Sequence, residues 1–121
     1  MIKISKEIYT VLSDNEELNA LVDGRIFPIA SAVDTKFPFI LFSRDSYTPS
    51  YVKDGISTKT ATITIMVMTN DYANSIDVAD AVNKAMITHS RKWKLAEVNE
   101  DYSENDKTSV FLQILKYTIN K

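Results

Sequence analysis

The fold is decided by residues Thr58–Met86, which have the sequence TKTATITIMVMTNDYANSIDVADAVNKAM. From Thr60 to Thr69, apolar and polar residues alternate, which is the pattern of a β-strand with one buried face. The predicted buried face carries Ala61, Ile63, Ile65 and Val67. The opposite face carries Thr60, Thr62, Thr64, Met66 and Met68.

A helix is predicted directly after this strand. Asn70 and Asp71 are turn formers that end the alternation. From Tyr72 onward, apolar residues recur at the spacing of one helical face: Val78, Ala79, Val82, Ala85 and Met86. The sequence therefore predicts a strand and a helix that bury their apolar faces against each other.

Length and composition indicate one folded domain covering residues 1–121. The chain is 45% hydrophobic and 25% charged and has only two glycines, as in a soluble globular protein. It has no cysteine, which excludes disulfides and fits a reducing compartment. The first residues lack the apolar core of a signal peptide, and no run approaches the roughly 18 apolar residues of a membrane span. We therefore expect a cytoplasmic protein with no membrane partner.

Two helices are predicted at the start of the chain. The first turns Ile4, Ile8, Val11 and Leu12 to one side. The second is predicted to begin at Asp14, because Asp14 and Glu17 have the spacing of a capping box, and to end at Gly24. Arg25–Pro28 then forms a brief extended segment, since proline disfavours helix at the residue before it.

The remaining segments are predicted to be strands and their connections. Phe39–Phe42 is a short strand, apolar on both faces, and Asp45–Ser57 is a long polar loop. Asn99–Lys107 is an acidic turn between a weak strand and a last strand, Ser109–Ile119, that is apolar on both faces. The predicted fold class is α+β: an antiparallel sheet with an N-terminal helical segment and one long helix packed on one face, in the order α-α-β-β-β-α-β-β.

No residue pattern indicates catalysis, a cofactor or a metal site. His89 is the only histidine, and its place near a helix carboxyl end is favourable without any catalytic role. The acidic segment lacks the glycine and the alternate-position ligands of a calcium loop. Two glycines cannot supply a phosphate-binding loop. We therefore expect no enzyme activity, no cofactor and no metal.

One basic cluster leaves a nucleic-acid function as the alternative. Arg91, Lys92 and Lys94 flank Trp93, which could stack on a base as in small α+β RNA-binding modules. The same residues also fit a core or edge tryptophan with basic side chains facing water. The net charge of −2 gives no general attraction to nucleic acid, so we expect no tight binding.

Met66 and Met68 admit two interpretations. They could be ordinary half-exposed surface on the strand face opposite the helices. Methionine also suits adaptable contacts between proteins, because its side chain is flexible and polarizable.

Several short motifs follow one another in a recognisable order: a leading helix before Asp14–Leu18 (DNEEL), Asp23–Pro28 (DGRIFP), Phe37–Ile40 (FPFI), Asp54–Gly55 before the long strand, and a Tyr72–Met86 helix. Together they resemble the tail-completion, or tail-terminator, family of long-tailed bacteriophages and prophages. The resemblance covers nearly the whole chain, although the final hairpin matches only in kind.

This resemblance implies a structural protein that forms a ring, commonly of six subunits. The ring caps the head-proximal end of the tail tube, so its partners are its own copies, the tail tube protein and the head-completion or connector protein. The implied location is the host cytoplasm during assembly and then the virion. From the residues themselves we expect contacts through Tyr47, Tyr51 and Lys53 in the loop and Met66 and Met68 on the sheet, with the charges of the terminal hairpin.

Overall fold

The computed structural model describes residues 3–29, 36–52, 55–89, 93–105 and 108–120, with the backbone alone described at 47–52, 55–59, 105 and 120. The elements are α1 (Ile4–Ser13), α2 (Glu16–Val22), β1 (Ile26–Pro28), β2 (Phe39–Val52), β3 (Gly55–Thr69), α3 (Tyr72–His89), β4 (Trp93–Asn105) and β5 (Thr108–Asn120). Their order is the predicted one. None of the helices in these ranges is long and apolar enough to cross a membrane.

The strands form one sheet in the order β1-β2-β3-β5-β4. Three of the four pairings are antiparallel, but β1 runs parallel to β2, with Ile26 opposite Ile40. The α+β class is confirmed, whereas a purely antiparallel sheet was wrong at this one pair. A tight hairpin turn could not give this pairing, because parallel neighbours need a longer connection than antiparallel ones.

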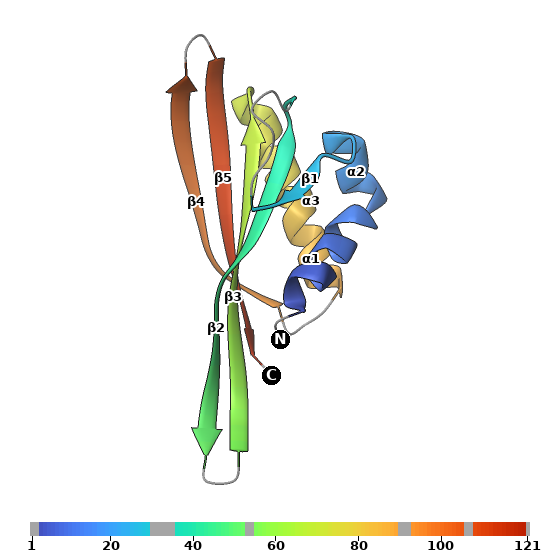
Figure 1. Cartoon of the computed structure of the whole chain (residues 1–121). Coiled ribbons are helices and arrows are strands. Elements are labelled where there is room, and N and C mark those ends of the chain that lie inside the picture. Colours follow the sequence, from blue (N-terminus) through green and yellow to red (C-terminus); the bar gives the residue numbers. More distant parts are fainter. Residues whose placement is uncertain (1–2, 30–35, 53–54, 90–92, 106–107, 121) are drawn as a thin grey trace.

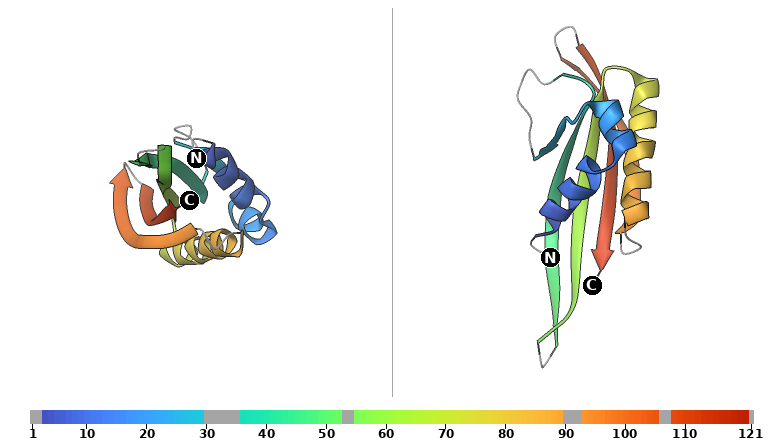
Figure 2. Two further views of the ribbon diagram at one scale, coloured as in Figure 1. Left: turned by 90° about the horizontal axis from the view of Figure 1, so that it is seen from below. Right: turned by 90° about the vertical axis from the view of Figure 1, so that its right-hand side faces the viewer.

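All three helices lie on one face of the sheet (Figures 1 and 2). The core between the two layers takes the predicted face of β3, because Ala61, Ile63, Ile65 and Val67 are all buried. On α3, the buried apolar residues are Val78, Ala81, Val82, Ala85 and Met86. The predicted packing of the central strand against the following helix is therefore confirmed.

Polar groups inside this core are hydrogen bonded. The Tyr117 side chain of β5 is fully buried, and its hydroxyl donates to Asn83 Oδ1 on α3 at 2.9 Å. Gln113 Nε2 donates to Ser75 Oγ at 3.3 Å, again between β5 and α3. Because an unpaired buried polar group is costly, these two bonds fix how α3 sits on β5.

The N-cap of α2 lies one residue later than predicted. Its N-cap is Asn15, whose Oδ1 accepts a hydrogen bond from the Leu18 amide at 2.9 Å, while Asp14 caps the end of α1. The helix ends through two left-handed residues, Asp23 with φ 52° and Gly24 with φ 71°. The helix therefore stops just before Gly24, where its end was predicted. Glycine suits this position because it adopts a left-handed conformation without steric cost.

The segment Asp45–Ser57, predicted to be a loop, is instead part of a long hairpin. Strands β2 and β3 stay paired from Phe39 opposite Met68 to Val52 opposite Gly55. Pro49 is compatible with this strand because β1 pairs with residues 40–42 of β2, so the described residues beyond them form an edge of the sheet, where proline is tolerated. Residues 47–52 and 55–59 project beyond the helices as a two-stranded ribbon, which we call the hairpin arm (Figure 1).

The acidic turn predicted at Asn99–Lys107 is also mostly strand. β4 continues to Asn105 and β5 begins at Thr108, while Asp106 and Lys107 lie outside the described residues. β4 is an edge strand of the sheet, where charged side chains are well tolerated and discourage edge-to-edge aggregation. The charged residues of this segment therefore belong to an exposed edge strand, and the prediction of a turn was wrong for most of it.

Candidate interaction surfaces

The sheet face opposite the helices carries an apolar patch that includes the predicted Met66 and Met68. Met66 lies between Leu41 of β2 and Ile114 of β5, and Met68 pairs with Leu112. All five side chains are half-buried, and the three helices lie on the other side of the sheet (Figure 2). We call these five residues the open-face patch. For Met66 and Met68, the placement on the face away from the helices was predicted from the alternation, and their role in contacts remains a prediction.

Tyr47 and Tyr51 belong to the hairpin arm. Their backbones pair with Ala61 and Ile56 of β3. Lys53, the third residue predicted in this segment, lies outside the described residues. The arm extends β2 and β3, whereas the open-face patch lies on β2, β3 and β5, over the body of the sheet.

Arg25 brings together two of the short motifs noted in the sequence. Its Nε donates to the Pro38 carbonyl at 3.0 Å and a terminal guanidinium nitrogen donates to the Phe37 carbonyl at 3.4 Å. The Ile40 amide in turn donates to the Arg25 carbonyl at 2.9 Å, next to the parallel pairing of β1 with β2. These contacts give Asp23–Pro28 and Phe37–Ile40 a structural role, which is to attach the helical layer to the start of the long hairpin.

A groove between α3 and β4 is a surface that the sequence did not predict. It is lined mainly by apolar side chains, and three of them are well exposed: Ile76 at 45%, Leu95 at 40% and Val98 at 48%. A bulge between Leu95 and Glu97 shifts the register, so that Val98 faces the same side as Leu95. Simple alternation along β4 could not have revealed this, because the bulge reverses the pattern in mid-strand. We call this surface the α3–β4 groove.

One end of the α3–β4 groove is aromatic and acidic. The Phe111 ring lies 5.8 Å from the Tyr72 ring and 5.2 Å from the Tyr102 ring, measured between centroids. The Tyr72 hydroxyl donates to both carboxylate oxygens of Glu100, at 2.9 and 3.1 Å. This hydrogen bond, with the charge of Glu100, raises the pKa of Tyr72 above its ordinary value.

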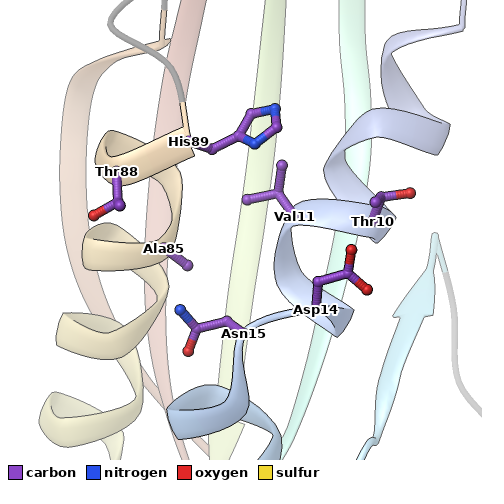
Figure 3. Close-up of a pocket in the computed structure, with 7 residues that line it drawn as sticks. All are labelled: Thr10, Val11, Asp14, Asn15, Ala85, Thr88 and His89. Carbon is purple, nitrogen blue, oxygen red and sulfur yellow. The ribbon is translucent and has the colours of Figure 1, made fainter.

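His89 lies in a depression between the end of α3 and helix α1 (Figure 3). Its Nε2 lies 3.3 Å from Glu7 Oε1, so the two helices are joined by an ion pair when the imidazole is protonated. The Thr10 hydroxyl nearby donates to the Lys6 carbonyl inside α1. His89 thus has a partner that sequence spacing did not indicate, and the contact is one between helices.

The Trp93 side chain is not available to stack on a base. The Trp93 side chain is only 4% exposed and belongs to the core cluster. Lys94 is exposed, while Arg91 and Lys92 lie outside the described residues. On the open face of the terminal hairpin, Lys116 is paired with Glu97 at 3.7 Å. Of the two interpretations of Trp93, the structure supports the core tryptophan.

Comparison with known proteins identifies a matching family and a similar fold. The family model of tail completion protein gp17 matches residues 6–112 of the chain. The chain is also similar to one in a solved structure described as the virion of native gene transfer agent (GTA) particle, with 15% identity and a TM-score of 0.72. That alignment covers 94% of this chain and 92% of the other, and at such low identity it establishes the fold alone. No curated protein sequence matches the chain significantly.

Proposed function

Since the chain belongs to the tail completion protein gp17 family, we propose that it is a structural subunit whose copies form a ring, of six subunits, at the head-proximal end of a phage or prophage tail. There it ends growth of the tail tube and joins the tail to the head connector. Its partners are its own copies, the tail tube protein and the head-completion or connector protein. It acts without catalysis, first in the host cytoplasm and then as part of the virion.

The family match over residues 6–112 is the observation that carries this proposal. The open-face patch supports it, because a contiguous apolar area on a folded protein commonly marks an interface. Met66 and Met68 supply flexible side chains there, which suit contacts with more than one partner surface.

The hairpin arm gives a second line of support. Described β5 residues pair with β3 only as far as Thr60, so from Pro49 and Lys59 outward the two arm strands are paired with each other alone. An isolated two-stranded hairpin is marginally stable in water. The arm therefore gains most from a partner surface, and tyrosines such as Tyr47 and Tyr51 supply contact area at low entropy cost.

A shortened arm tests the proposal. Thr48 and Thr60 are paired, so Pro49–Lys59 can be replaced by Asn-Gly, the preferred two-residue hairpin turn. We expect the melting temperature of the monomer to stay nearly unchanged, because none of the described core residues lies in the arm. Light scattering and negative-stain images should show rings for the natural chain and none for the shortened one.

Complementation of a tail-completion mutant provides the functional measurement. The shortened chain should give tails of uncontrolled length, and Tyr51→Ser, which keeps the arm, should give a weaker defect of the same kind. The role assigned to the arm is refuted if the shortened chain still assembles and still ends tails. The ring itself is refuted if the natural chain stays monomeric both alone and with the tail tube protein.

A further inference from the structure

The α3–β4 groove is an apolar surface left open on the helix side of the sheet. Ile76, Leu95 and Val98 are each at least two-fifths exposed, and Tyr72 and Tyr102 at its end are 45% and 50% exposed. Exposed apolar side chains that gather in one groove mark a contact site for another chain, whereas scattered ones do not. We therefore expect a segment of another chain to bind in the α3–β4 groove.

Its charge indicates what kind of segment fits. Asp80 and Glu100 line the α3–β4 groove, and Glu100 also lies beside Tyr72 and Tyr102 at its end. Of the residues that line it in the described part of the chain, none is basic. The charge of Asp80 is shared with Lys84, at 3.0 Å, which leaves the Glu100 end as the more negative one. Carboxylates beside aromatic rings attract an ammonium or guanidinium group.

We propose that the α3–β4 groove binds the hairpin arm of a second copy of this chain. The inference rests on the proposed ring and names the contact that closes it. Between residues 46 and 59, the sequence has two cations, Lys53 and Lys59, against one carboxylate, Asp54. The same segment supplies the apolar residues Tyr47, Tyr51, Val52 and Ile56. The arm thus has the positive charge and the apolar side chains that complement the acidic, apolar α3–β4 groove.

The lengths also agree. The part of α3 along the α3–β4 groove, Tyr72 to Asn83, is about 17 Å long at the helical rise per residue. Residues 47–52 of β2 extend about 20 Å at the rise of a strand. One arm can therefore lie along the whole groove.

The contact must join two different copies. In Figure 1 the arm projects from one end of the molecule, while the start of α3 and the paired ends of β4 and β5 lie at the other end. An arm cannot reach the groove of its own chain, so each copy offers its arm to one neighbour and its groove to the other. Such head-to-tail contacts close into a ring when the rotation between copies permits.

Cysteine cross-linking tests this contact, because the natural chain has no cysteine. One variant carries Ser50→Cys in the arm, and a second carries Val98→Cys in the α3–β4 groove. The matched control is Asn99→Cys, on the next residue of β4, which is exposed and pairs with Ile114 of the open face. Each groove or control variant is mixed with the arm variant under mild oxidation, and the mixed dimer is measured by mass spectrometry.

We expect the mixed dimer with Val98→Cys to form at least about tenfold faster than with Asn99→Cys, and Glu100→Lys to weaken ring assembly by reversing the charge at the groove end. Faster cross-linking to Asn99→Cys would place the arm on the open face and overturn the inference. Rings that form without preference for Val98→Cys would overturn it while leaving the proposed ring intact. If the natural chain forms no rings, the proposed function is refuted. If Val98→Cys also cross-links slowly to the arm variant, the contact between arm and groove is refuted as well.

Discussion

Replacing Tyr117 by phenylalanine should have effects of opposite sign at neutral and at alkaline pH. The Tyr117 side chain is 0% exposed, and its hydroxyl has a hydrogen bond to Asn83. Near neutral pH, Tyr117→Phe loses this bond and should lower the free energy of unfolding by about 1 kcal/mol. For a domain of this size, that corresponds to a fall of roughly 3–6 °C in melting temperature.

At high pH, Tyr117 lowers the free energy of unfolding of the natural chain. Burial raises the pKa of Tyr117 above its ordinary value of 10.0, because the interior disfavours the phenolate. The stability contributed by the protonated phenol is therefore complete below the unfolded pKa and is lost progressively as the pH rises from there toward the higher pKa of the folded chain. Each pH unit above that value favours the unfolded chain by about 1.4 kcal/mol. Tyr117→Phe is free of this loss, so the two stabilities should become equal near about pH 11.

Chemical denaturation at a series of pH values measures both effects, and Asn83→Ala is the matched control. That variant leaves the buried Tyr117 hydroxyl without its partner, so it should cost about 1–3 kcal/mol at neutral pH. It keeps the phenol and should keep the alkaline loss of stability. The reasoning is refuted if Tyr117→Phe and the natural chain lose stability in parallel above about pH 10.

The other predictions concern the two faces of β3 and nucleic acid. Ile65→Asp places an unpaired charge in the core and should cost several kcal/mol of a total of roughly 6–18 kcal/mol, whereas Thr62→Asp should be mild; equal melting temperatures would contradict the assignment of faces. Met66→Lys combined with Met68→Lys should leave the monomer folded and weaken self-association in light scattering, whereas Thr62→Lys should weaken it less; unchanged association would remove the open-face patch as an interface. Fluorescence anisotropy with single-stranded oligonucleotide should give a Kd weaker than about 100 µM at physiological salt, and salt-sensitive micromolar binding would contradict this.

The sequence predicted the part of the fold in which a strand and the helix that follows it pack against each other. In β3, alternation placed Ile63 and Ile65 in the core and Met66 and Met68 on the other face, and the structure agrees. The helix after it was predicted with its buried face. Such patterns can be recognised in the sequence because a buried position favours an apolar residue whichever element packs against it. Burying that residue removes apolar area from water in every case.

The hairpin arm, the acidic edge strand and the α3–β4 groove were decided only by the tertiary structure. Residues 47–52 and 55–59 form strands because they continue the pairing of β2 with β3, and no described core residue lies among them to impose a pattern. The bulge between Leu95 and Glu97 depends on the pairing of β4 with β5, and it brings Val98 beside α3. The grouping of Tyr72, Tyr102 and Phe111 joins residues from three elements. Local periodicity records which side of an element is buried, but the partners of an exposed strand are set by backbone hydrogen bonds that most side chains can accommodate.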